Sequence, residues 1–249
     1  MNQEHSRILA LPVLTPLRAT KPLNSCTVCH GWPLNSNPVF GETITAVKVL
    51  VAGASGVIGI RLVPLLIGSG YEVFGVTRTP SKTEMLRSTG ASPVVCDVYE
   101  RDPLRTLVRA IRPDVVVDQL TDLPDNAARI QEYRAATRRM QREGTGNLLE
   151  AARDAGVTRY LAQSIAWKLP EDSGAAVLDR ERAVLDAGGV VLRYGQFYGP
   201  GTYWTTRLPP PPRIHVDEAA HETLRAIHAP SGVVTLVESD GLGGQTQVR

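Results

Sequence analysis

The sequence predicts an α/β protein with a doubly wound parallel sheet of about seven strands over residues 46–238. An apolar run at 47–52 breaks into three evenly spaced glycines and then a helical pattern. Further apolar runs alternate with helical patterns as far as residue 237, which is typical of βαβ units. A formal net charge of +2 and 43% hydrophobic residues suit an ordinary globular domain.

The glycine turn is the most specific local signal. Gly53, Gly56 and Gly59 follow the first predicted strand with the spacing G-x-x-G-x-x-G. Such glycines let the backbone turn tightly, approach a pyrophosphate and pack the next helix closely. The start of that helix offers free N–H groups to phosphate oxygens. The turn therefore predicts a Rossmann-type dinucleotide site, with cofactor contacts at Gly53, Ala54, Ser55, Gly56, Val57, Ile58 and Gly59.

The other elements follow from the same alternation. Near-continuous apolar runs, as expected of strands buried on both faces, predict strands at 47–52, 71–77, 93–97, 114–119, 159–164, 189–194 and 233–237. Helical periodicity predicts helices at 57–68, 81–89, 102–112, 126–156, 176–187 and 216–228. Pro64 falls inside the first helix, where a lost hydrogen bond costs about 3 kcal/mol unless a kink absorbs it.

The two ends of the chain depart from this pattern. Residues 1–45 carry five prolines and no sustained period, which predicts an irregular or disordered leader. We expect this leader to be an over-extended start, with the true start at Val47, or a dispensable tail. Residues 239–249 are Gly-rich and polar, which predicts a flexible tail.

The cysteines predict no metal site and no disulfide framework. Residues 26–30 read C-T-V-C-H, the pattern of c-type haem attachment. That attachment needs export, and the prolines at 12 and 16 interrupt the only early apolar stretch, so no signal peptide is predicted. A zinc site would need a fourth ligand nearby. Cys96 lies in an apolar run and indicates a buried thiol in a reducing cytoplasm.

Charge and hydropathy exclude two classes of partner. The basic run Arg134 to Arg142 is interleaved with Glu132 and Glu143, which predicts a solvated helix face and no nucleic-acid site. No apolar segment is long enough to span a bilayer, so no membrane partner is expected.

Later motifs resemble the short-chain dehydrogenase/reductase superfamily, in its extended, epimerase/dehydratase-like branch. GTGNLLEAA at 144–152 resembles the helix before the catalytic strand, and YLAQS at 160–164 resembles that strand. LRYGQFYGPG at 192–201 resembles the sixth strand with its turn, and HVDEAA at 215–220 a later helix start. The resemblance covers nearly all of 47–238. It implies an NAD(P)-dependent oxidoreductase or a sugar-nucleotide epimerase-like enzyme.

The end of the second strand indicates which dinucleotide is preferred. An NAD site places a carboxylate about twenty residues after the glycine turn. Arg78 stands there, and its guanidinium suits the 2′-phosphate of NADP(H), which we predict over NAD(H); the alternative is an exposed strand-end arginine. The resemblance implies further cofactor contacts at Asp97, Val98, Gln119, Leu120 and Thr121. Asp97 could equally form a turn or cap a helix.

The catalytic pair that the resemblance implies is missing. Active members carry, after the serine at Ser164, a tyrosine that acts as acid/base and a lysine that lowers its pKa. Alignment on Glu181 puts Ser173 and Val177 at those two places, and neither ionises near neutrality. The substitutes are Tyr160, Lys168, Tyr194 and Tyr198. We take Ser164, Lys168 and Tyr198 as the catalytic candidates.

Two classes of function therefore stay open. One is an atypical NADP-dependent enzyme that uses Ser164; the other is a non-catalytic NADP(H)-sensing regulatory protein. The C-terminal substrate lobe of epimerase-like enzymes is largely missing, because few residues separate Trp204 from Arg213. Members of the superfamily often dimerise through the helices predicted at 102–112 and 126–156, so a homodimer is expected.

Overall fold

A seven-stranded parallel sheet forms the centre of the computed structural model, which describes residues 46–169 and 171–238. The predicted leader, its C-T-V-C-H motif and the predicted tail lie outside the described residues. The strand order is β3-β2-β1-β4-β5-β6-β9, and every neighbouring pair is parallel. The strands are Lys48–Ala52 (β1), Glu72–Thr77 (β2), Ser92–Val95 (β3), Val115–Asp118 (β4), Arg159–Ile165 (β5), Val190–Tyr194 (β6) and Gly232–Leu236 (β9). The predicted doubly wound fold is confirmed.

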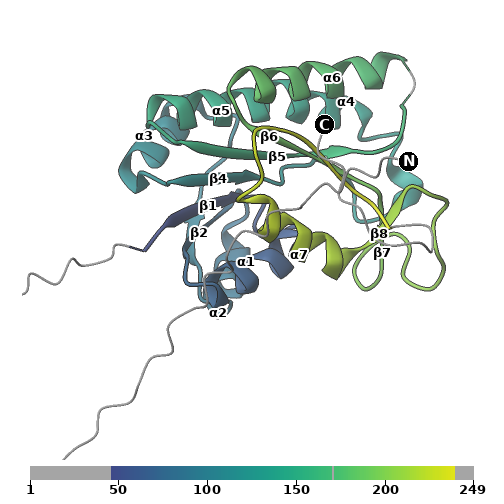
Figure 1. Cartoon of the computed structure of the whole chain (residues 1–249), viewed down its shortest axis with the longest axis horizontal. Coiled ribbons are helices and arrows are strands. Elements are labelled where there is room, and N and C mark those ends of the chain that lie inside the picture. The colour runs from purple at the N-terminus through teal and green to yellow at the C-terminus, as the bar shows by residue number, and fades with distance from the viewer. Residues whose placement is uncertain (1–45, 170, 239–249) are drawn as a thin grey trace, which may run out of the picture. The chain divides into compact units, whose positions relative to one another are not determined.

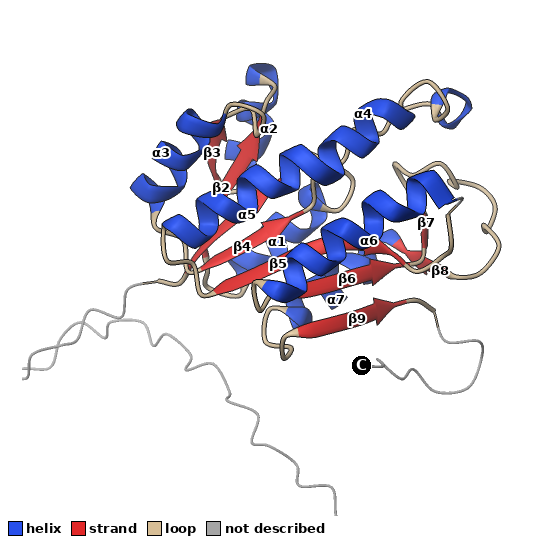
Figure 2. Cartoon of the chain, turned by 90° about the horizontal axis from the view of Figure 1, so that it is seen from above, coloured by secondary structure: helices blue, strands red, loops and turns tan. Residues whose placement is uncertain are grey.

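Helices cover both faces of this sheet (Figure 1). One face carries α1 (Gly59–Gly68), α2 (Thr83–Ser88) and α7 (Val216–Ala226). The other carries α3 (Arg101–Ile111), α4 (Arg134–Arg139), α5 (Thr145–Asp154) and α6 (Glu171–Asp186), as Figure 2 shows from above. The strand order reverses between β1 and β4, and in open α/β sheets ligands bind beyond the carboxyl ends of the strands at that point. The fold therefore places a binding site at the turn after β1.

Residues 49–52 of β1 contribute alternately to two apolar cores. Val49 and Val51 pack with Leu62 and Leu66 of α1 on the first face. Leu50 belongs to the opposite core, with the side chains of α3 and α5. A strand that is buried on both sides must be apolar at every position, which is why the run at 47–52 was such a clear signal.

Two parts of the fold differ from the prediction. The single helix predicted at 126–156 is wrong: the segment contains a 3₁₀ turn (Ala127–Arg129), α4, a π-helical stretch (Met140–Gly144) and α5. The Asn126 side chain accepts a hydrogen bond from the N–H of Ala128 and so caps the first turn separately. The short strands β7 (Gln196–Tyr198) and β8 (Arg213–His215) were not predicted, because three residues are too few to show a period.

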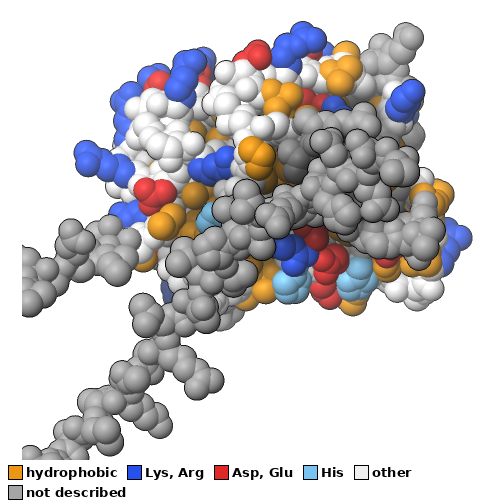
Figure 3. All heavy atoms as spheres, in the orientation of Figure 1, with side chains coloured by type: hydrophobic (Ala, Val, Ile, Leu, Met, Phe, Trp, Pro, Cys, Tyr) orange, Lys and Arg blue, Asp and Glu red, His pale blue; other side chains and the backbone are white. Residues whose placement is uncertain are grey.

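Acidic side chains lie among the Lys and Arg side chains of the face in Figure 3. In the described part of the chain, no helix has both the length and the apolarity to cross a membrane. Within the same residues, no cluster of His, Cys, Asp and Glu could hold a metal ion.

Candidate functional site

Two of the three turn glycines are required by the fold itself. Gly53 has a φ of +81°, and a Cβ there would lie 2.6 Å from the carbonyl oxygen of Gln119. A Cβ on Gly59 would lie 2.5 Å from the carbonyl carbon of Ala54. Gly53 therefore makes the turn, and Gly59 lets α1 approach it closely.

Gly56 is different, because a Cβ there would crowd a single backbone atom and its φ is not left-handed. The residue is exposed, and a Cβ there would meet only the carbonyl oxygen of Gly53, at 3.1 Å. No side chain caps the start of α1 at Ile58. An open glycine beside an uncapped helix start provides what an anion needs: close approach to the backbone and N–H groups in a favourable dipole.

A polar cluster that we name the Arg78 cluster (Arg78, Tyr99 and Asp122) lies at the ends of three strands. Arg78 follows β2, and its Nη2 donates to Asp122 Oδ1 at 2.5 Å. The Tyr99 hydroxyl, beyond β3, donates to Asp122 Oδ2 at 2.9 Å. The hydrogen bond with Asp122 raises the pKa of Arg78, whereas burial first and then this carboxylate raise the pKa of Tyr99 to about 12. Sequence reasoning found Arg78 but missed both of its partners.

The predicted contacts at Asp97 and Val98 are partly occupied by the protein itself. Asp97 Oδ1 accepts a hydrogen bond from the backbone N–H of Tyr99 at 3.0 Å. The Val98 side chain is buried, and its carbonyl accepts a hydrogen bond from Asn147 at 3.0 Å. Asp97 thus acts as a turn former here, the alternative that its place after β3 had left open.

The segment after β4 presents its backbone, not its first side chain, to the glycine turn. Gln119 points into the core, where its Nε2 donates to the Tyr194 hydroxyl at 3.0 Å. The carbonyl of Gln119 lies against Gly53. Leu120 is held by Gln163, which donates to its carbonyl at 2.7 Å, while Thr121 is exposed. Thr121 is therefore the residue of this predicted set that a ligand in solution can reach through its side chain.

Ser164 lies at the end of β5 beside a carboxylate. Its hydroxyl donates to Glu181 Oε1 at 2.5 Å, and Ser164 is only 7% exposed. Arg193 holds the same carboxylate through two bonds, of 2.8 Å from Nε and 2.5 Å from Nη2. Val177 is buried, and the side chain of Ser173 lies outside the described residues. The Glu181 carboxylate therefore lies next to Ser164, but its negative charge is already balanced by the Arg193 guanidinium.

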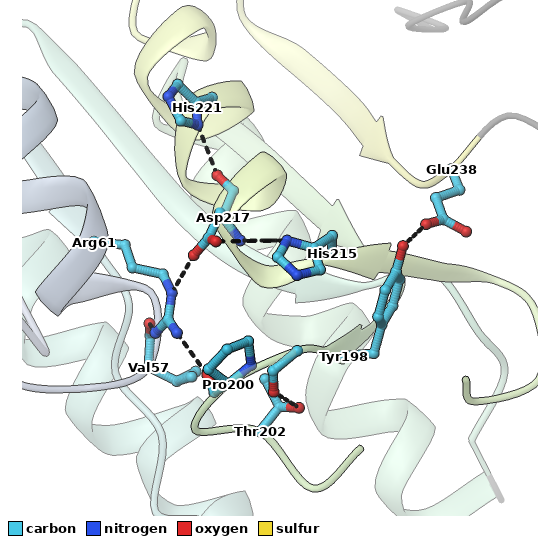
Figure 4. Close-up of polar contacts among 10 residues, drawn as sticks. Val57, Arg61, Tyr198, Pro200, Thr202, His215, Asp217, His221 and Glu238 are labelled. Atoms are coloured by element: carbon cyan, nitrogen blue, oxygen red, sulfur yellow. Dashed lines mark hydrogen bonds and ion pairs between the residues drawn. The ribbon is translucent and has the colours of Figure 1, made fainter. Parts of the chain in front are cut away.

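The four residues predicted as substitutes for a tyrosine–lysine pair lie in separate surroundings. Lys168 is exposed in the loop after β5. Tyr160 and Tyr194 are fully buried; burial raises the pKa of Tyr160 well above its usual value and that of Tyr194 to about 12. Tyr198 donates its hydroxyl hydrogen to Glu238 and packs edge-on against His215, with ring centroids 5.1 Å apart (Figure 4). No hydrogen bond in the described residues links Ser164 with Lys168 or Tyr198.

Arg61 connects the glycine turn to the segment that contains Tyr198. From α1 it donates to Asp217 Oδ1 at 2.6 Å, to the Val57 carbonyl at 2.8 Å and to the Pro200 carbonyl at 2.5 Å (Figure 4). Asp217 lies in the first turn of α7, and Pro200 lies in the loop after β7. One side chain thus holds the first helix, the last helix and the loop after Tyr198 together. Sequence reasoning missed it, although a polar residue inside the apolar pattern of α1 was a visible signal.

Comparison with known proteins identifies the family of this chain. Residues 49–166 match the NAD dependent epimerase/dehydratase family. The 3-diazoavenalumate denitrifying reductase of a Streptomyces species is 35% identical over 224 residues, covering 73% of this chain and 72% of that protein. The chain belongs to the NAD-dependent epimerase/dehydratase family. This family member also matches a 3-beta-hydroxysteroid dehydrogenase of Mycolicibacterium neoaurum, at 33% identity over 46% of the chain and 31% of that protein.

Solved structures support the fold of this family member. UDP-glucose 4-epimerase of Thermotoga maritima has a TM-score of 0.63 and 20% identity and covers 77% of each chain. UDP-glucose 4-epimerase of Thermus thermophilus, solved in complex with NAD, has the same TM-score and identity and covers 80% of this chain and 79% of that one. At this identity the likeness shows a common fold and nothing finer.

Proposed function

We propose that this protein binds NADP(H) in preference to NAD(H) at the turn after β1. The observation that carries the proposal is Gly56, an exposed glycine that the packing does not require, beside the uncapped start of α1. The half-exposed guanidinium of Arg78 supports the choice of the 2′-phosphate. The other proposed contacts are Ala54, Ser55, Val57, Ile58, Asp97, Val98, Leu120 and Thr121, with Gln119 through its backbone.

We further propose that the bound nucleotide serves a reduction. NADPH supplies a hydride when it is bound. Reduction of a carbonyl also needs an acid to protonate the new alkoxide, and the usual tyrosine and lysine are missing. A diazonium carbon has no such need: it takes the hydride, forms a C–H bond and releases N₂. The name of the Streptomyces relative, a reductase of a diazo compound, favours this substrate class over a sugar nucleotide.

Three side chains are proposed to act on the substrate. Ser164 directs its proton toward Glu181, so it offers a substrate the lone pairs of its oxygen. Lys168 is exposed and can supply a charge for a substrate carboxylate. Tyr198 is half-buried at the start of the loop that Arg61 holds, where it can pack against the substrate.

A non-catalytic NADP(H) sensor is the second candidate. The observation that favours it is the ion pair of Glu181 with Arg193: the carboxylate beside Ser164 is already bound by a guanidinium. We also propose that the protein acts in the cytoplasm as a homodimer. The half-buried free thiol of Cys96 supports a reducing compartment.

The test begins with calorimetric titration of the full chain with NADPH and with NADH. Tight NADPH binding with much weaker NADH binding is the expected result. Oxidation of NADPH is then followed with an arenediazonium carboxylate, a ketone and a UDP-sugar, each corrected for the rate without protein. Consumption of the diazonium compound supports the reductase, and binding without turnover of any probe supports the sensor. If neither nucleotide binds, the proposal is wrong.

A further inference from the structure

Within the Arg78 cluster, the ion pair of Arg78 with Asp122 crosses the strand that leads into the glycine turn. Arg78 directly follows β2, and Asp122 comes four residues after the end of β4. In the sheet, β1 lies between these two strands. The guanidinium therefore reaches across the end of β1, at the edge where the adenosine half of a dinucleotide would lie.

Asp122 is the fixed member of this pair. The residue is 8% exposed, and its second carboxylate oxygen accepts the Tyr99 hydroxyl. Its backbone carbonyl also accepts a hydrogen bond from Thr137 at 3.1 Å. The Arg78 side chain, in contrast, is 53% exposed, and its bond to Asp122 uses one nitrogen, Nη2. A ligand can therefore move Arg78, whereas the carboxylate stays in place.

This asymmetry has a different consequence for each nucleotide. A 2′-phosphate must share Arg78 with a buried carboxylate and must also lie close to that negative charge. The 2′-hydroxyl of NADH neither competes for Arg78 nor is repelled by the carboxylate, because it is neutral and does not need the guanidinium. The carboxylate of Asp97, which accepts from the Tyr99 N–H, adds to the negative charge around Arg78 and raises its pKa. The carboxylates of Asp122 and Asp97 thus repel the 2′-phosphate that Arg78 attracts.

We infer that Asp122 is a specificity-determining residue that limits the preference of this protein for NADPH over NADH. The inference rests on the proposed function, since it concerns the same nucleotide site. It makes the choice of cofactor a balance between one mobile guanidinium and one fixed carboxylate. An arginine after β2 without a carboxylate like Asp122 beside it would give a stronger preference for NADPH over NADH than this chain can have.

The experiment is calorimetry of the full chain and four variants with each nucleotide: Asp122→Asn, Asp125→Asn, Arg78→Gln and the double variant that combines Arg78→Gln with Asp122→Asn. Asp122→Asn keeps the shape of the side chain and removes its charge. We expect it to bind NADPH about threefold to fivefold more tightly, as the loss of one half-exposed competing ion pair allows, with NADH affinity changed by less than about twofold. Asp125→Asn removes an exposed charge from the same loop and should change neither affinity. When Asp122→Asn is added to Arg78→Gln, NADPH affinity should rise far less than it does when Asp122→Asn is made in the parent chain.

The outcomes separate this inference from the proposed function. A weaker NADPH affinity in Asp122→Asn would mean that the carboxylate orients Arg78, and an unchanged ratio of the two affinities would mean that it has no part in selection; either result overturns the inference alone. Failure of the parent chain to bind either nucleotide overturns both. If Asp122→Asn does not fold, Asp122→Ser removes the same charge from a smaller side chain and gives the same comparison.

Discussion

Alanine substitutions at the three turn glycines should separate folding from nucleotide binding. Gly53→Ala forces a side chain into a left-handed conformation, at a cost of roughly 1–2 kcal/mol, and onto a carbonyl oxygen 2.6 Å away. Gly59→Ala places a methyl group 2.5 Å from backbone atoms that cannot move aside, so a loss of roughly 1–3 kcal/mol or more is expected. Both variants should unfold at a clearly lower urea concentration than the parent chain.

Gly56→Ala should behave in the opposite way. Its φ is not in the left-handed region, so the reduced freedom of the unfolded chain stabilises the variant by roughly 0.4–1 kcal/mol. The 3.1 Å contact with the Gly53 carbonyl offsets part of that gain. We expect a free energy of unfolding close to that of the parent, but NADPH affinity reduced at least about tenfold, because the methyl group keeps the pyrophosphate from the backbone.

Urea unfolding and calorimetric titration on the same three preparations check this prediction. Gly53→Ala and Gly59→Ala control for effects that act through stability alone. The prediction is refuted if Gly56→Ala loses as much stability as Gly59→Ala, or if it binds NADPH as the parent does. The first result would make Gly56 a packing residue, and the second would move the phosphate away from the turn.

Three further predictions concern the groups around the turn. Arg61→Met keeps an unbranched side chain but loses three hydrogen bonds, so we expect the free energy of unfolding in urea to fall by about 1–3 kcal/mol. Asp217→Asn leaves the two bonds to carbonyl groups intact and should lower the free energy of unfolding less. Ser164→Ala should lower turnover of the diazonium probe at least about tenfold with unchanged NADPH affinity, because it removes the oxygen proposed to position the substrate; full turnover would remove Ser164 from the site. The fold keeps the phenol of Tyr194 neutral, with its pKa raised from 10.0 to about 12, so this residue contributes stability below pH 10 that is lost as the pH rises through about 12. Alkaline titration of unfolding should show this loss, and Tyr194→Phe should reduce it.

Local signals in the sequence were enough to predict the sheet. Val49, Leu50 and Val51 must be apolar because the two cores lie on opposite sides of β1, and that requirement is visible without any structure. Gly53 and Gly59 were equally visible, because backbone geometry allows no other residue there. The break within 126–156 was not, because its helical periodicity continues on both sides of the π-helical stretch.

The candidate site was only half predictable, since its contacts join distant positions. Arg78 was singled out by its place after β2, but its partner Asp122 is 44 residues away and carries no local mark. Glu181 served as a point of alignment, and its bond to Ser164, across 17 residues, came only with the packing of α6 on β5. A sequence motif shows which residues lie at the end of one strand. The contacts of a site depend also on which strands are neighbours in the sheet, and a local motif does not show this.

Arg61 connects the proposed nucleotide site to the loop that contains the proposed substrate contact Tyr198. The guanidinium bonds to the Val57 carbonyl at the glycine turn and to the Pro200 carbonyl in the loop after Tyr198. If a phosphate bound at the start of α1 shifted that turn, the shift would reach the loop through the hydrogen bonds of Arg61. A reductase would use this contact to position Tyr198 over its substrate, and a sensor would use it to present the loop to a partner. The same arginine would suit either function, and what distinguishes them is whether Ser164, which donates its proton to the carboxylate that Arg193 binds, contacts a substrate.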